Sequence, residues 1–187
     1  LDNYVYFDRN GIFVEGSHTR DESVPFFDGI QVGHVILGEK LPIKGSTVLT
    51  TAVALSTIFQ KNQTIPDHIQ FDSSYQITLL YGDITVMLGK DEYLEDKMTR
   101  VIAILPKLSG EKGILHLENV TDSSKLITFE REAQEDGTMI SIDVSSAYEN
   151  ALANWHGGYD QEGDYTCEGE YDENGNYTGP KPTQESI

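Results

Sequence analysis

The side chains that could perform chemistry are scattered along this sequence rather than grouped. No two histidines have the spacing of zinc ligands, and the five are His18, His34, His68, His116 and His156. Ser17 and His18 are neighbours, but adjacent side chains on an extended segment point to opposite faces, so they do not pair as nucleophile and base. No nucleophile elbow, phosphate-binding glycine loop or cysteine–histidine arrangement occurs. The sequence therefore predicts no catalytic residues, no metal site and no cofactor.

An imperfect repeat near the C-terminus offers a different chemistry. Residues 159–166 and 171–178 share a Tyr-Asp start and a Tyr-Thr end, and they carry the oxygen ligands that calcium prefers, namely Asp160, Asp164, Asp172, Asn174 and Asn176. Neither copy has the Gly at position six and the Glu at position twelve of an EF-hand loop. We therefore interpret the repeat as a solvated acidic linker, and a calcium-binding surface adhesion module stays an alternative function.

The composition changes near residue 131. Residues 132–187 hold thirteen acidic residues and one basic residue, Lys181, which gives this part −12 of the total net charge of −18. Such a segment buries too little apolar surface to offset the conformational entropy of folding. We expect a folded domain over residues 1–131, followed by an acidic, low-complexity and mostly disordered tail over residues 132–187.

The bulk properties exclude several partners. A net charge of −18 argues against nucleic acids and anionic membrane surfaces, since both recruit clustered lysine and arginine. Cys167 is the single cysteine, so no internal disulfide forms, as in a cytosolic protein or an exported one from an organism that avoids disulfides. No apolar run reaches the ~18 residues of a membrane span. The chain starts at Leu1, and we expect a fragment or processed form whose missing N-terminal segment could hold an anchor.

Hydrophobic periodicity predicts an α+β fold with a mostly antiparallel sheet and two packed helices. A helical period begins near Ser46, and the second helix is expected over 91–108 with Asp91 as its N-cap. Asn10-Gly11 predicts a hairpin turn between the first two strands. Strands are expected over 4–8, 12–15, 31–36, 65–71, 75–80, 84–88, 113–118 and 125–131, and 138–144 could form a further short strand.

The run 125–131 is the last strand of the expected domain. One of its sides has no obvious later partner, and exposed edges are either protected or used for strand addition. In the alternative, residues 138–144 fold back and pair with it. If this strand is a docking edge, Leu126, Ile127, Thr128 and Phe129 would bind the partner strand. Lys125 and Arg131 would steer an acidic partner segment toward it.

Several motifs follow one another in the order of a known family. An Asp8-Arg9-Asn10-Gly11 hairpin is followed by Leu-Pro-Ile-Lys-Gly at 41–45, then by Tyr-Gly-Asp-Ile-Thr-Val-Met-Leu-Gly at 81–89 and a helix containing Lys97, and finally by Ile-Leu-His-Leu at 114–117. Over residues 4–131 this resembles the extracytoplasmic β domain of the bacterial cell-division proteins FtsQ and DivIB.

The resemblance implies a non-enzymatic scaffold of the division machinery. Such a scaffold binds FtsB-like (DivIC-like) and FtsL-like partners outside the membrane and helps to regulate septal cell-wall synthesis. It also implies a single-pass protein of the cell membrane, with this fragment on the extracytoplasmic side and monomeric. The family adds a partner strand to its last strand, which here is 125–131. Of the aromatic cluster found near that strand in relatives, only Phe129 is present. A secreted cell-wall hydrolase stays a second alternative, although the sequence offers no catalytic pair for it.

Overall fold

The computed structural model describes residues 3–45, 47–133 and 135–148. The chain divides into two compact units. The first comprises Leu1–Gly82 with Gly89–Asp91, and the second comprises Asp83–Leu88 with Glu92–Ile187. The expected α+β class with mostly antiparallel strand pairing is confirmed. The expected tail lies outside the described residues from 149 onward.

The first unit begins with the hairpin that Asn10-Gly11 predicts. Strands β1 (Tyr4–Phe7) and β2 (Phe13–Ser17) pair in antiparallel fashion. The Asp8 carboxylate accepts hydrogen bonds from the backbone N–H groups of Asn10, at 2.8 Å, and Ile12, at 3.0 Å. Gly11 has a φ of 74°, a conformation that glycine adopts without steric cost.

The rest of the first unit consists of three short strands and a helix. Strand β3 (Phe27–Asp28) pairs in parallel with β4 (His68–Phe71), which pairs in antiparallel fashion with β5 (Ile77–Tyr81). Helix α1 spans Val48–Lys61, and its buried stripe has the predicted helical spacing, with Ala52, Leu55 and Phe59 fully buried. The strand expected over 31–36 is wrong, since this segment makes only an isolated bridge between Val32 and Ile43.

The second unit contains four strands in the order β6-β7-β8-β9. Strands β6 (Ile84–Gly89) and β7 (Gly113–His116) are parallel, whereas β8 (Thr128–Glu132) pairs in antiparallel fashion with both β7 and β9 (Met139–Asp143). One row across the sheet joins four apolar side chains through the register, Val86, Leu115, Phe129 and Ile142. The first three are at most 1% exposed and form the centre of the core of this unit.

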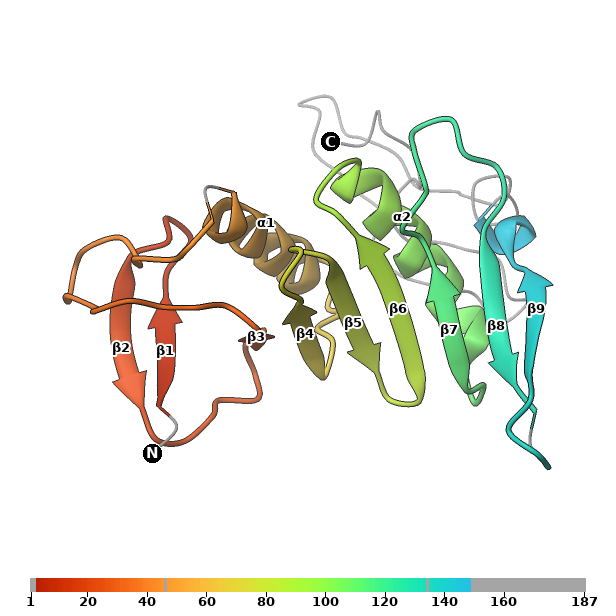
Figure 1. Ribbon diagram of the computed structural model, residues 1–187, viewed down its shortest axis with the longest axis horizontal. Coiled ribbons are helices and arrows are strands. Elements are labelled where there is room, and N and C mark those ends of the chain that lie inside the picture. The colour runs from red at the N-terminus through yellow and green to blue at the C-terminus, as the bar shows by residue number, and fades with distance from the viewer. Residues whose placement is uncertain (1–2, 46, 134, 149–187) are drawn as a thin grey trace, which may run out of the picture. The chain divides into compact units, whose positions relative to one another are not determined.

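Helix α2 (Leu94–Ile104) lies on one face of these strands and continues as the 3-10 helix η1 (Leu105–Leu108) (Figure 1). The α-helical geometry ends before Pro106, because a proline without an N–H group cannot continue the α-helical ladder. The expectation that Asp91 caps this helix is wrong. The capping position is Tyr93, and Asp91 instead accepts a hydrogen bond from Thr51 at 3.1 Å. Among the described residues, no helix has the length and apolar character of a membrane span.

Candidate partner-binding edge

Strand β8 contains most of the predicted docking segment, and it is not an edge. It has a strand on each side, β7 and β9, so its main-chain groups already have partners. The alternative in which residues 138–144 fold back is therefore the arrangement observed. The sheet reaches Asp143, past the expected domain boundary at residue 131.

A local signal explains why the chain folds back. Asp136-Gly137 lies between β8 and β9, and Asp-Gly between apolar runs is a strong hairpin signal. Gly137 has a φ of 72°, and Thr138 donates its N–H to the Asp136 carboxylate at 2.9 Å. This bond from Thr138 holds the pKa of Asp136 below its usual value. Ile140, Ile142 and Val144 alternate with Ser141 and Asp143, which is the pattern of a half-buried strand.

The six predicted site residues have different environments. Ile127 and Phe129 are each only 1% exposed and belong to the core, whereas Leu126, just before β8, is 66% exposed. Lys125 is also exposed, and Thr128 is half-buried. Arg131 lies 3.8 Å from Glu111. Glu111 therefore offsets the charge of Arg131. Of the two cations expected to steer a partner, Lys125 is the more exposed.

Strand β9 is the last strand of the sheet among the described residues. Val144 donates its N–H to Ile127, and Ala133 donates its N–H to Thr138. Hydrogen-bonded and non-hydrogen-bonded pairs alternate in an antiparallel ladder, so Ile140 and Ile142 also direct their backbone groups toward β8. The backbone N–H and C=O groups of Met139, Ser141 and Asp143 consequently point away from β8.

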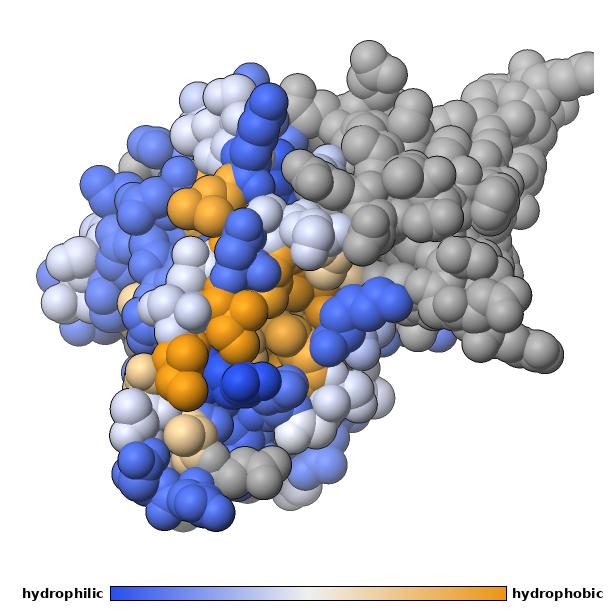
Figure 2. Space-filling view, turned by 90° about the vertical axis from the view of Figure 1, so that its right-hand side faces the viewer, coloured by the Kyte–Doolittle hydropathy of each residue, from blue (hydrophilic) through white to orange (hydrophobic). Residues whose placement is uncertain are grey.

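Apolar side chains accompany this open ladder. Met139 is 41% exposed and Ile140 46% exposed. Figure 2 views the side of the molecule on which β9 lies and shows hydrophobic residues gathered there. A strand edge that combines outward main-chain groups with exposed apolar side chains suits the addition of a further strand.

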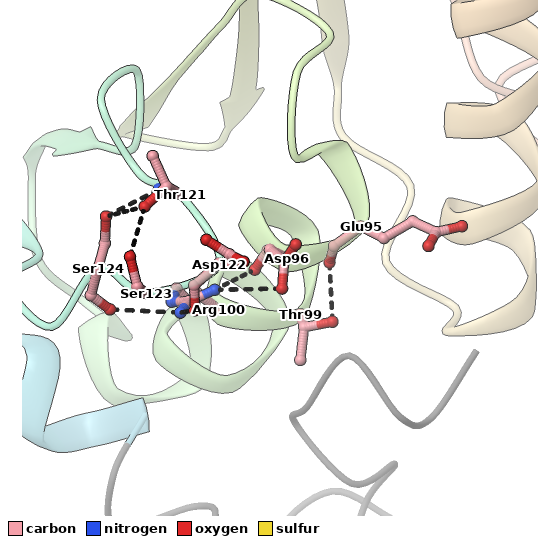
Figure 3. A network of polar contacts seen from close by, with 8 residues as sticks. All are labelled: Glu95, Asp96, Thr99, Arg100, Thr121, Asp122, Ser123 and Ser124. Atoms are coloured by element: carbon pink, nitrogen blue, oxygen red, sulfur yellow. Dashed lines mark hydrogen bonds and ion pairs between the residues drawn. The ribbon is translucent and has the colours of Figure 1, made fainter.

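Arg100 on α2 contacts the segments on both sides of the β8–β9 hairpin, and Figure 3 shows its contacts with the segment before β8. Its guanidinium group donates to the carbonyl oxygens of Asp122, at 3.4 Å, and Ser124, at 3.3 Å, just before β8. The same group lies 4.8 Å from the ring centre of Tyr148, after β9. Arg100 is only 4% exposed. Its position on the apolar face of α2 was missed, because the sequence pattern does not distinguish a buried arginine from one at the border of the stripe.

A histidine lies between two carboxylates on the opposite face of the same sheet. His116 Nδ1 is 2.7 Å from Glu118, and its Nε2 is 3.3 Å from Glu130 on β8. Burial alone lowers the pKa of His116, but the two glutamates together outweigh it and raise the pKa above its usual value of 6.5. The sequence suggested an ordinary polar-face histidine, because Glu130 is remote in sequence and only the β7–β8 register brings it close.

Other candidate sites have less support in the described part of the chain. No group of three or more histidine, cysteine or acidic side chains there is placed to hold a metal ion. The calcium-type oxygen ligands of the tail lie outside the described residues, and they are Asp160, Asp164, Asp172, Asn174 and Asn176.

Comparison of the chain with protein-family models, with curated protein sequences and with solved structures finds no match.

Proposed function

We propose that this chain is a non-enzymatic extracytoplasmic scaffold of the FtsQ/DivIB type, and that it binds a strand of an FtsB-like or DivIC-like partner along β9. An FtsL-like protein is the second expected partner, and the assembly would help to regulate septal cell-wall synthesis. In the whole protein, a single membrane span would place this fragment outside the cell membrane. The observation that carries the proposal is that the backbone N–H and C=O groups of Met139, Ser141 and Asp143 point away from β8.

The proposed site differs from the expected one by one strand. The family resemblance places partner addition at the last strand of the sheet, and in the described residues that strand is β9 rather than β8. Main-chain hydrogen bonds would then supply much of the affinity, while alternate side chains such as Ile140 would supply specificity. Additional contacts with the partner could come from Leu126, Lys125 and Thr128. Ile127 and Phe129 are buried, so they support the site only by stabilising the fold.

Ser141 provides a sharp test. Its N–H group points away from β8, so Ser141→Pro removes an outward donor while the bonds between β8 and β9 persist. Ser141→Ala keeps that donor and is the matched control. We expect Ser141→Pro to weaken partner binding about tenfold or more and Ser141→Ala to bind like the unmodified chain.

The measurement is calorimetric titration of the full chain with the extracytoplasmic segments of the DivIC-like and FtsL-like proteins from the same organism. Circular dichroism confirms that each variant is folded. Equal affinities of the two Ser141 variants would contradict strand addition at β9. Failure of the unmodified chain to bind either segment would contradict the scaffold function itself.

A further inference from the structure

A cavity in the first unit takes no part in the proposed function. It is an open pocket of about 740 Å³, lined by β1, by residues 24–28 with Ile30, and by one side of α1, including Val53. Small-molecule sites in proteins typically measure about 300–1,000 Å³ and combine an apolar lining with a few polar groups. The cavity therefore has the size of a site for one small organic molecule.

Five aromatic side chains contribute to the lining, and they are Tyr4, Tyr6, Phe7, Phe26 and Phe27. They form pairs across the cavity wall, with ring centres 5.6 Å apart for Tyr4 and Phe26 and 6.1 Å apart for Phe7 and Phe27. His68 and Phe71, which do not line the cavity, pack against Phe26 at 5.0 Å and Phe27 at 6.2 Å. These contacts hold the rings in place before any ligand arrives.

A cationic side chain, Arg20, already contacts one aromatic ring of the cavity wall, that of Phe26. The guanidinium group of Arg20 lies 4.8 Å from the centre of the Phe26 ring and donates a hydrogen bond to the carbonyl oxygen of Asp67 at 2.9 Å. The negative face of an aromatic ring attracts cations, and several rings together form the cages that recognise ammonium groups. The contact with Arg20 shows that this chain uses the same attraction at the cavity wall.

Three of the lining residues are aspartates whose carboxylates are held by local hydrogen bonds, and two of them, Asp21 and Asp28, are exposed to solvent. Asp8 accepts from Asn10 and Ile12, Asp21 accepts from Ser23, and Asp28 accepts from Gly29. The other Asp28 oxygen lies 3.3 Å from His68. Hydrogen bonds, chiefly from Ile12 and Ser23 respectively, lower the pKa values of Asp8 and Asp21, so both carboxylates are ionised at neutral pH. The lining carries two cations, Arg9 and Arg20, and Arg20 is already engaged.

We propose that this cavity binds a small organic cation, a molecule with an apolar body and an amine or quaternary ammonium group. The apolar body would fill the space between the rings and α1. The cationic group would lie against ring faces with one of the three carboxylates nearby. This inference does not depend on the proposed scaffold function.

Three probes with the same apolar body test the proposal: 4-phenylbutylamine, 4-phenylbutanol and 5-phenylpentanoate. Each is titrated into the full chain and followed by calorimetry and by NMR shifts of the tyrosine and phenylalanine rings. We expect the amine to bind saturably, about fivefold to thirtyfold more tightly than the alcohol, and the acid to bind most weakly. Equal affinity of the amine and the alcohol, or no binding of any probe to the folded chain, would overturn the proposal.

Two substitutions in the cavity lining test where the amine binds. Val53→Trp fills the cavity from α1 and should abolish binding of the amine, and unchanged binding would refute this location. Tyr4→Leu keeps an apolar side chain but removes a ring, so it should reduce the ratio of amine to alcohol affinity by at least about threefold. Tyr75→Leu, a tyrosine 49% exposed that does not line this cavity, is the matched control. Both affinities in this ratio are measured on the same folded Tyr4→Leu variant, so the test remains valid if Val53→Trp fails to fold. An unchanged ratio of amine to alcohol affinity in Tyr4→Leu would overturn the proposal that the ligand is a cation.

Discussion

At the residue scale, the charge of His116 affects the stability of the second unit. Glu118 and Glu130 approach the same imidazole from its two nitrogen atoms. When the imidazole is protonated it offsets the repulsion between these carboxylates, and when it is neutral that repulsion returns. His116 thus links β7 to β8 in a way that depends on pH.

The sign of this dependence follows from the raised pKa of His116. A histidine whose pKa is higher in the folded state than its unfolded value of 6.5 contributes stability that is fully present below that value. The contribution is lost as the pH rises through the folded-state pKa. We expect His116→Gln to cost on the order of 1 kcal/mol near pH 5.5 and much less near pH 8.5.

Urea denaturation of both chains at each pH measures this difference. The matched control is His18→Gln, which changes an exposed histidine of the first unit. A cost for His116→Gln that is the same at both pH values would contradict the role of the two glutamates.

At the element scale, the β8–β9 hairpin depends on α2 through Arg100. We expect Arg100→Met to destabilise the chain by about 1–3 kcal/mol, because the part-buried hydrogen bonds to the carbonyl oxygens of Asp122 and Ser124 are lost while apolar volume is kept. Amide hydrogen exchange at Val144 and Ala147 should accelerate. Thr99→Ala on the same helix removes only a bond to Glu95 (Figure 3) and should change stability by less than about 0.5 kcal/mol. Equal effects of the two substitutions would show that Arg100 does not anchor the hairpin.

Elements with strong local signals could be predicted from the sequence, and those set by competing contacts could not. The Asn10-Gly11 hairpin and the buried stripe of α1 follow from backbone freedom and periodicity alone. The end of the sheet depended on whether residues 138–144 pair with β8, which is a contest between burial of Ile142 and solvation of an acidic segment. The docking edge expected from the sequence, 125–131, therefore lies one strand inside the edge of the described sheet. The burial of Arg100 and the approach of Glu130 to His116 depend on the tertiary register, which no local pattern contains.

At the scale of the whole molecule, the boundary of the folded part is the testable quantity. A chain ending at residue 131 lacks β9 and leaves β8 with an unpaired side, whereas a chain ending at residue 148 retains the hairpin and Tyr148. We expect the chain 1–131 to be at least about 2 kcal/mol less stable than both the chain 1–148 and the full chain, because it loses the apolar burial and the ladder hydrogen bonds of β9.

Urea unfolding followed by circular dichroism compares the three lengths. Equal stability of the two shortened chains would mean that β9 contributes nothing to the folded domain. It would also remove β9 as the foundation of the proposed docking edge.

Side chains and backbone groups alternate in direction along β9, and this limits where insertions and deletions can be tolerated during evolution. Inserting or deleting one residue within β9 would turn Ser141 and Asp143 toward the core and Ile140 and Ile142 away from it, and it would exchange the inward and outward backbone groups at the same time. The loop around Asp136-Gly137 can absorb a change in length, but the strand cannot absorb an odd one. Among descendants of the same ancestor, gaps should therefore collect in that loop and avoid residues 139–143.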